Sequence, residues 1–394
     1  MQKLCAFEEK LAISLKKLLG ARFPKILGAA VSGGADSTSL LLSLASLSSY
    51  CRSGAEGRQS VFGDEPFPKI VCVTVDHSIR PEEESSGDAA YVKDLCERLG
   101  VECFVKKIER GAVERLCGER KKGVEDAARA LRYQAFESFA KESGAEFICL
   151  AHNQNDALET LLMRFLQGSG SEALGGICER RGIFLRPLLE TSRAEIEEYL
   201  RLKGVSWRTD STNGDNKYLR NRIRNSLVPF LDENFVGWKK ALLAGAEKAA
   251  GDDLALDAFL NEKLERFKGK DGKDFFELSK KADGSFEYSA KIFSSLPAAL
   301  RRRLLYRTFE AMGVQDRVPY SFVKQISLWP ERAFKNASAA GLFACAKKDK
   351  VFIKKSQKEA TESGFFDIIM EDEPVRGLSV LRSAAVGDKV RDGI

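Results

Sequence analysis

The stretch that decides the fold is VSGGADST, residues 31–38, which directly follows an apolar run. The pattern predicts a strand that ends near Ser32, a glycine turn, and a helix that begins near Asp36. The two glycines let the main chain approach a ligand closely, and successive N–H groups at a helix N-terminus attract anions. We therefore expect a phosphate site that is built from the residues of this turn, namely Ser32, Gly33, Gly34, Ala35, Asp36 and Ser37.

The carboxylate of Asp36 distinguishes this turn from the Walker A phosphate loop. A Walker A loop reads G-x-x-x-x-G-K-[ST], whereas VSGGADST contains no lysine. A carboxylate repels a polyphosphate unless a cation lies between them, and Mg²⁺ accepts both as ligands. We therefore expect Asp36 to bind Mg²⁺, and the missing lysine indicates a bond cleavage different from that of kinases and GTPases.

The first half of the chain alternates strand and helix patterns. Strand patterns fall at 25–32, 69–77, 102–108, 146–152 and 183–189, and helical patterns fall at 37–48, 85–99, 123–142 and 153–167. This alternation predicts an α/β fold with a doubly wound parallel sheet, whose ligands bind beyond the carboxyl ends of the strands. The two histidines of the chain, His77 and His152, both lie at that edge, which favours one shared crevice.

The second half of the chain has a different organisation. The pattern is helical from about 235 to 328, and a β-hairpin is predicted from about 340 to 355. We therefore expect three parts, which are an α/β domain at 1–215, a linker helix with a helical domain at 216–335, and a small β-containing segment at 336–394.

The composition is that of a soluble protein of more than one domain. The chain has 394 residues, of which 44% are hydrophobic and 30% charged, and its net charge of +6 permits a polyanionic partner. Nine cysteines without C-x-x-C spacing predict a reducing, cytoplasmic compartment, with no disulfide framework and no zinc or iron–sulfur site. No run of about 18 apolar residues is present, so we expect no membrane span.

Two segments carry most of the positive charge of the second half. Residues 217–240 hold six basic and two acidic side chains, and residues 301–332 hold seven basic and three acidic ones, so each has a net charge of +4. Such runs are usually solvated helix faces, but beside a nucleotide-binding domain they suit RNA phosphates. The candidate RNA-binding residues are Arg220, Asn221, Arg222, Arg224, Arg301, Arg302 and Arg303.

Several motifs together resemble a known family. VSGGADST resembles the PP-loop of ATP pyrophosphatases, and GVEDAARALRYQAF at 123–136 resembles an E-x-x-A-R-x-x-R-Y helix. AHNQNDALET at 151–160 resembles A-H-H-x-D-D-Q-x-E-T, and the D-x-T-N…RNRIR pattern at 210–224 matches a further motif. Over roughly 25–230 the chain therefore resembles the tRNA(Ile)-lysidine synthetases, which have an adenine nucleotide α-hydrolase-like fold.

The resemblance implies a two-step reaction. ATP adenylates the wobble cytidine of tRNA(Ile) with a CAU anticodon, and L-lysine then displaces AMP to give lysidine. It implies a catalytic role for Arg129, nucleotide contacts from Asp76, His77, Arg132 and His152, and Mg²⁺ on Asp36. The lysine amine must lose its proton before it attacks, and this catalytic base stays open among Asp36, Asp156 and Glu159. The oligomeric state also stays open, with a dimer as one option.

The sequence departs from the family at Asn153, Asn155 and Ala157, where the motif has His, Asp and Gln. These departures keep a catalytically impaired RNA-binding relative as an alternative. A PP-loop tRNA thiolase is the nearer rival, although such enzymes need paired cysteines. Family members often carry a β-rich C-terminal domain, and LSVLRSAAVGDKVRDGI at 378–394 resembles its beginning, so we expect that domain to be either truncated or much reduced here.

Overall fold

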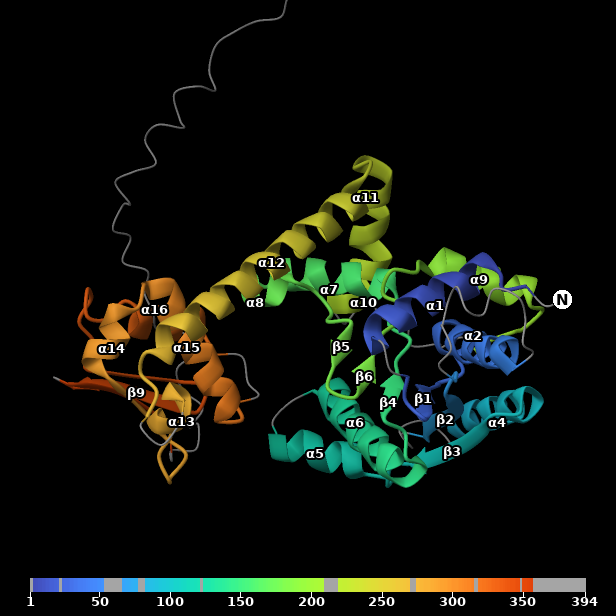
Figure 1. Ribbon diagram of the computed structural model, residues 1–394, viewed down its shortest axis with the longest axis horizontal. Helices are drawn as coiled ribbons and strands as arrows, with labels where there is room; N and C mark the ends of the chain where they lie inside the picture. Colours follow the sequence, from blue (N-terminus) through green and yellow to red (C-terminus); the bar gives the residue numbers. More distant parts are fainter. Residues whose placement is uncertain are drawn as a thin grey trace, which may run out of the picture. The chain divides into compact units, whose positions relative to one another are not determined.

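The computed structural model describes residues 3–20, 23–52, 66–76, 82–120, 123–208, 219–269, 274–314, 318–347 and 349–356. The chain forms two compact units, Met1–Leu256 and Asp257–Ile394, and the boundary falls within the long helix α12 (Trp238–Glu265) (Figure 1). The predicted division into three parts at 215 and 335 stays a prediction.

The first unit contains a six-stranded sheet in the order β3-β2-β1-β4-β6-β5. Its strands are β1 (Ile26–Ala30), β2 (Lys69–Asp76), β3 (Glu102–Lys107), β4 (Phe147–Cys149), β5 (Arg180–Arg181) and β6 (Phe184–Leu185). Five strands run parallel, and only the edge strand β5 pairs antiparallel. The predicted parallel sheet is confirmed, and the reversal of order at β1 brings the ends of β1 and β4 together as a ligand-binding edge.

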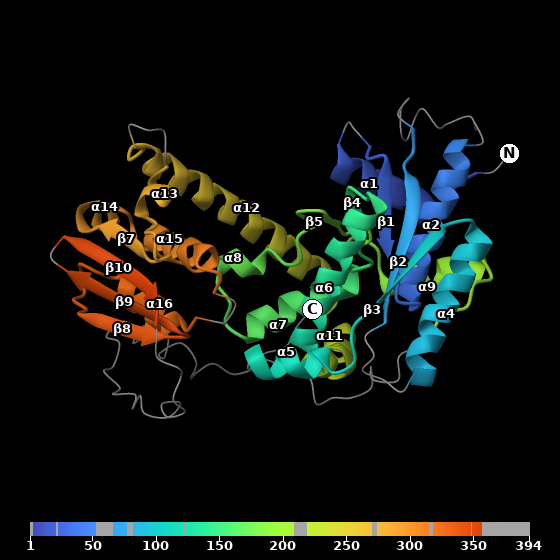
Figure 2. The same ribbon diagram turned by 90° about the horizontal axis from the view of Figure 1, so that it is seen from below.

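Helices cover both faces of this sheet (Figures 1 and 2). One face packs against α1 (Ala6–Leu19), α2 (Ala35–Arg52), α4 (Glu82–Leu99) and α9 (Arg193–Leu202), and the other packs against α6 (Val124–Ser143). The alternation of strand side chains explains this arrangement, because Cys72 faces the first core while Val71 and Val73 face the second. The unit also contains α5 (Ala112–Arg120), α7 (Gln154–Leu166), α8 (Ser171–Leu174), α10 (Leu219–Arg222), η2 (Ile223–Leu227) and α11 (Val228–Asn234).

The second unit combines helices with a four-stranded antiparallel sheet in the order β7-β10-β9-β8. Its elements are α13 (Phe275–Ser279), β7 (Phe286–Ser289), α14 (Ala290–Ser295), α15 (Ala298–Ala311), α16 (Tyr320–Ser327), β8 (Asn336–Ala339), β9 (Leu342–Lys347) and β10 (Lys350–Lys355). The predicted hairpin is confirmed as β9–β10. The helical prediction for 235–328 is wrong at β7, which pairs with β10 and buries Phe286 and Tyr288 on one face.

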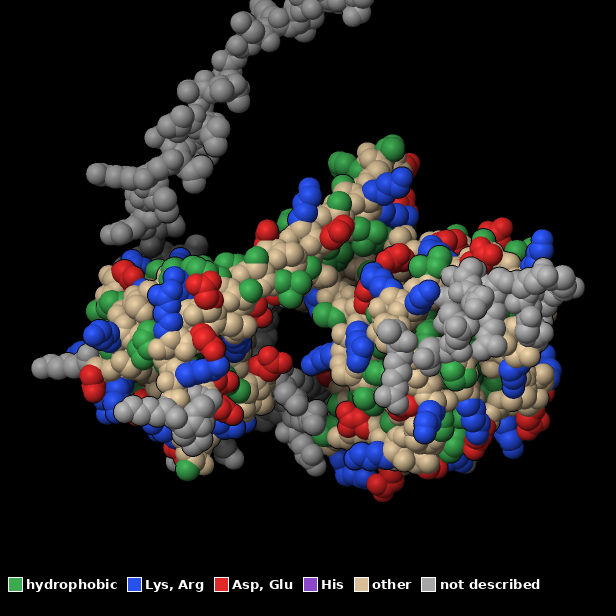
Figure 3. All heavy atoms as spheres, in the orientation of Figure 1, with side chains coloured by type: hydrophobic (Ala, Val, Ile, Leu, Met, Phe, Trp, Pro, Cys, Tyr) green, Lys and Arg blue, Asp and Glu red, His purple; other side chains and the backbone are tan. Residues whose placement is uncertain are grey.

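Charge is spread over the visible surface of each unit. On the face drawn in Figure 3, the described Lys and Arg side chains alternate with Asp and Glu side chains over both units. This mixing agrees with a net charge of only +6 in 394 residues. None of the helices in the described ranges is both long enough and apolar enough to cross a bilayer.

Arg301 corrects one of the sequence-based expectations. The residue is 2% exposed, and its guanidinium donates to the main-chain carbonyls of Leu296 and Ser327 and to the carboxylate of Glu331. It therefore holds the second unit together and does not face RNA. Neighbouring residues on a helix point about 100° apart, so three consecutive arginines do not form one basic patch. Arg303 pairs with Asp257, and Arg302 is half-buried.

We expect Arg301→Met to destabilise the second unit by about 3 kcal/mol, because it leaves buried carbonyl groups without a donor. Chemical unfolding followed by circular dichroism measures this change. Arg302→Met on the same helix is the matched control and should change the free energy of unfolding by less than about 0.5 kcal/mol. Equal effects of the two substitutions would contradict a structural role that is specific to Arg301.

Candidate active site

The turn between β1 and α2 is held in shape by its own hydroxyl groups. The Ser37 hydroxyl accepts the N–H of Ser32 at 3.1 Å and donates to the carbonyl of Gly34 at 3.1 Å. The Thr38 hydroxyl donates to the Gly33 carbonyl at 3.2 Å. Gly33 has a φ of 87°, a conformation that favours glycine, and a Cβ there would make a tight contact of 3.3 Å with the Tyr91 side chain. The predicted strand, glycine turn and helix are confirmed.

Asp36 lies in the first turn of α2 and is held from two sides. Its Oδ1 accepts from Asn153 Nδ2 at 2.8 Å, and its Oδ2 accepts from Arg193 Nη1 at 2.8 Å. The side chain keeps 29% of its surface exposed. Burial raises the pKa of the Asp36 carboxyl group, while the charge of Arg193 and the hydrogen bond from Asn153 act in the opposite direction. The carboxylate is thus oriented beside the phosphate turn and stays accessible.

Two of the departures from the family motif explain how Asp36 is held. Asn153 is 3% exposed and caps α7 by accepting the N–H of Asp156, while its amide group donates to Asp36. Asn155 Oδ1 accepts the main-chain N–H of Arg193 at 3.1 Å and so fixes the start of α9. Both asparagines therefore link the helices that surround Asp36.

Arg193 is a site residue that the sequence analysis missed. It is the first residue of α9, and besides Asp36 it contacts Glu197 one turn later at 2.9 Å. In the sequence, an arginine followed four residues later by a glutamate is typical of a solvated helix face. Only the tertiary contact with α2 distinguishes Arg193 from such a residue.

Two predicted carboxylates meet two predicted RNA-binding arginines. Glu159, which is 3% exposed, accepts from Arg220 Nε at 2.9 Å and from Arg224 Nε at 2.6 Å. Asp156 accepts from Arg220 Nη2 at 2.7 Å. The short α10 and η2 segment brings both guanidinium groups onto one face of α7. Arg220 and Arg224 therefore neutralise carboxylates in this structure, while Arg222 is exposed and Asn221 is half-buried.

His152 marks a cationic environment at the end of β4. Its Nδ1 is buried and lacks a hydrogen-bond partner. Burial, followed by the positive charges of four nearby arginines, lowers the pKa of His152 to about 3, so the ring is neutral at physiological pH. These arginines are Arg186, Arg129, Arg220 and Arg132. Arg129 and Arg132 lie on α6, and their positive charge near the end of β4 favours an anionic ligand.

The comparisons with known proteins agree with this arrangement. A family model for the PP-loop domain matches residues 7–231. The tRNA(Ile)-lysidine synthase of Treponema denticola is 38% identical over 348 residues, which cover 88% of this chain and 69% of that protein. The chain belongs to the PP-loop tRNA(Ile)-lysidine synthase family. The resemblance drawn from the motifs is therefore confirmed.

Two further matches complete these comparisons. The tRNA(Ile)-lysidine synthase of Treponema pallidum (strain Nichols) is 37% identical over 81% of this chain, and the match covers 63% of that protein. The chain thus spans about two thirds of the length of these family members. Among solved structures, the U34-tRNA thiolase NcsA from Methanococcus maripaludis with its [4Fe-4S] cluster has a TM-score of 0.47 and 16% identity. That match covers 61% of this chain and 78% of the thiolase chain.

The remaining residues expected from the family motifs have varied positions. Asp76 ends β2 at the ligand-binding edge and is half-buried, while Arg129 lies on α6 and donates to the Tyr133 hydroxyl at 3.3 Å. Arg132 is half-buried on the same helix. His77, the motif residues at 210–213 and the side chain of Glu125 lie outside the described residues.

The donors at Asp36 fit a magnesium ion. Mg²⁺ in nucleotide sites is usually bound by one or two carboxylates, with phosphate oxygens and water completing its shell. Asp36 supplies a partly exposed carboxylate, and the Ser32 and Ser37 hydroxyl groups lie in the adjoining turn, 3.2 Å from each other. This set of hard oxygen donors is the kind that Mg²⁺ prefers.

Proposed function

We propose that this chain catalyses the ATP-dependent conversion of the wobble cytidine of tRNA(Ile) with a CAU anticodon into lysidine, with L-lysine as co-substrate. The observation that carries the proposal is the convergence at one sheet edge of the phosphate turn, Asp36 and the Asp156–Glu159 carboxylates. The names of the family members supply the reaction. We further propose a cytoplasmic location, because all nine cysteines are free thiols that suit a reducing compartment.

The first step is adenylation of the cytidine. The ring carbonyl oxygen attacks the α-phosphorus of ATP, and the N–H groups of residues 33–37 hold the departing pyrophosphate. Arg129 and Arg132, which lie close enough to His152 to shift its pKa, supply positive charge beside the reacting phosphate. Mg²⁺ bound to Asp36 would neutralise part of the negative charge on the pyrophosphate.

The second step is attack by lysine. Its neutral ε-amine attacks the activated ring carbon, the bond to the adenylate oxygen breaks, and AMP leaves. Asp156 and Glu159 pair with two guanidinium groups in this structure, so the ammonium group of an incoming lysine would bind there by replacing one of these arginines. The candidates for the base that removes the amine proton are Asp36, Asp156 and Glu159.

The test is a complete reaction with purified chain, ATP, L-lysine and tRNA(Ile) bearing a CAU anticodon, followed by mass spectrometry of the nucleosides. We expect lysidine at position 34 and one AMP per modified tRNA. A matched tRNA with uridine at the wobble position is the control and should stay unmodified. Retained tRNA binding without any ATP–pyrophosphate exchange would favour the non-catalytic RNA-binding alternative.

Arg193 gives a prediction about pH dependence. Arg193→Gln removes the positive charge that lowers the pKa of Asp36, so this pKa should rise further and Asp36 should be protonated at a higher pH. Because the proposed role requires the ionised carboxylate, the acidic limb of ATP–pyrophosphate exchange should move to higher pH, with a smaller loss of rate at alkaline pH.

The matched control for Arg193 is Arg201→Gln, which removes the other arginine that pairs with Glu197 on α9. Its pH profile should follow that of the parent. A uniform loss of rate at every pH in Arg193→Gln would contradict an effect through Asp36 and would indicate a purely structural role.

A further inference from the structure

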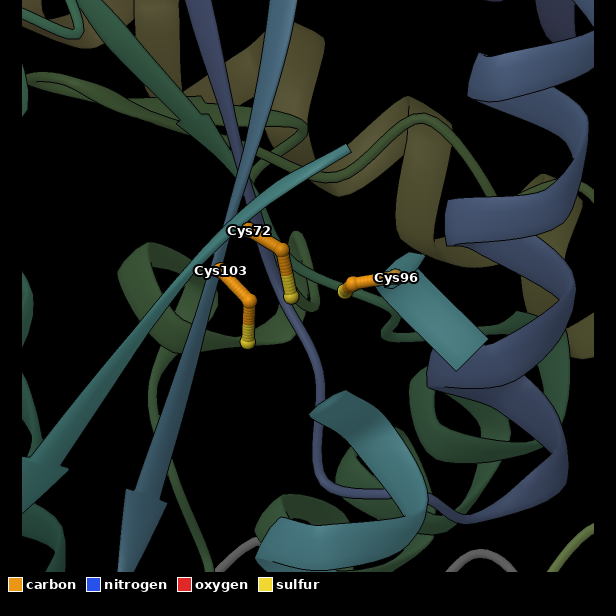
Figure 4. A group of neighbouring side chains, drawn as sticks. All are labelled: Cys72, Cys96 and Cys103. Atoms are coloured by element: carbon orange, nitrogen blue, oxygen red, sulfur yellow. The ribbon is translucent and has the colours of Figure 1, made fainter. Parts of the chain in front are cut away.

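Three cysteine side chains meet between the sheet and α4 (Figure 4). Cys72 on β2 and Cys103 on β3 are register partners in neighbouring parallel strands, so their side chains leave the sheet on the same face. Cys96 on α4 points toward them from the opposite side. All three Sγ atoms lie within 4.8 Å of one another. Three thiols from three different elements therefore converge on one point.

The distances between the sulfurs are close to those of a three-sulfur metal site. A planar site with metal–sulfur bonds of about 2.3 Å places its sulfurs about 4.0 Å apart. The sulfurs here lie within 4.8 Å, so small rotations about the cysteine χ1 angles would close the difference. Cys72 and Cys96 are fully buried and Cys103 is half-buried, which leaves one ligand near the surface.

The surroundings favour soft ligand chemistry. Ile70, Val92 and Leu95 pack around the group in the same apolar core, and no carboxylate or imidazole joins it among the residues that the structure describes. Within the described part of the chain the site therefore offers only sulfur donors, which bind metals as thiolates.

We propose that Cys72, Cys96 and Cys103 form a binding site for one monovalent copper ion with three sulfur ligands. Thiolates select soft ions such as Cu(I). Structural zinc sites are almost always four-coordinate, and the described part of the chain offers only three donors here. Binding releases the thiol protons to solvent and changes no oxidation state. The absence of C-x-x-C spacing hid this site from sequence analysis, because its ligands come from two strands and a helix.

The proposal is tested by anaerobic titration of the full chain with Cu(I) against a chromophoric Cu(I) chelator. We expect the parent to remove one equivalent from the chelator, and X-ray absorption to show three sulfur neighbours. Cys103→Ser should lose this equivalent, whereas Cys117→Ser, which changes another half-buried cysteine, should keep it. Equal copper stoichiometry in all three proteins, or a shell of nitrogen and oxygen donors, would overturn the proposal.

Thermal unfolding provides a second measurement that does not depend on the chelator. A ligand that binds only the folded state raises the unfolding temperature, so Cu(I) should raise it in the parent and in Cys117→Ser but not in Cys103→Ser. Circular dichroism without copper establishes whether each variant folds. If Cys103→Ser does not fold, Cys96→Ser is used as the test variant in its place. Tighter binding of Zn²⁺ than of Cu(I) would overturn the choice of metal.

Discussion

Asp36→Asn is expected to lower both ATP–pyrophosphate exchange and lysidine formation by roughly 10²–10³-fold, the loss typical of removing one electrostatic contact to a reacting group. The substitution keeps the shape of the side chain but removes its charge, so the proposed magnesium ligand is lost. It also places an amide group where Oδ2 accepts from Arg193 at 2.8 Å. Radiolabelled pyrophosphate exchange measures the first step, and nucleoside mass spectrometry measures the product.

The matched control is Asp94→Asn, which neutralises an exposed aspartate on α4 that pairs with Arg98. It should leave both rates within about twofold of the parent, as expected for a surface ion pair. Binding of tRNA should be unchanged in both variants. An Asp36→Asn protein that folds and turns over ATP at the parent rate would remove the basis for the proposed function.

Glu159→Gln is expected to lower lysidine formation by about 10²-fold, while pyrophosphate exchange falls much less. The reason is that Glu159 lies on α7 and holds Arg220 and Arg224, whereas the phosphate turn is on a different element. The substitution also leaves two guanidinium groups without their buried partner, so we expect a loss of about 2 kcal/mol in the free energy of unfolding.

The two steps must be measured separately to interpret Glu159→Gln. Pyrophosphate exchange reports adenylation, and single-turnover formation of lysidine at several lysine concentrations reports the second step. Glu190→Gln is the control, because Glu190 is an exposed glutamate that pairs with Lys17 at 3.5 Å. Equal losses in both steps would show that Glu159 positions the nucleotide and does not act in the use of lysine.

Structural features that depend on residues adjacent in the sequence could be predicted from the sequence. The turn at 31–38 follows from glycine, hydroxyl and carboxylate residues that lie side by side in the chain, and the strand positions follow from short apolar runs. β7 was missed, because four residues whose partner strand lies far along the chain give no distinctive local pattern. Residues 286–289 form a strand because they pair with β10, and not because of a local preference for strand structure.

The sequence gives the position of each charged side chain along the chain, but it does not show which residues that side chain pairs with. The positive charge of Arg220 and Arg224 is visible in the sequence, but their acidic partners on α7 are brought to them only by the fold. For the same reason, an RNA contact was expected from Arg301, which the fold buries. In the sequence, Asn153 and Asn155 indicate the loss of two side chains of the family motif. In the structure, their amide groups organise the surroundings of Asp36.

The hydrogen bonds of the Ser37 hydroxyl limit which residues can replace serine at this position during evolution. The hydroxyl fixes the curvature of the turn by accepting the N–H of Ser32 and by donating to the carbonyl of Gly34. A nucleotide would therefore meet a preorganised cradle, which keeps the entropic cost of capture small. Alanine at this position would remove both hydrogen bonds that shape the turn, so genetic suppressors should restore a hydroxyl at residue 37 itself and should not arise elsewhere in the chain.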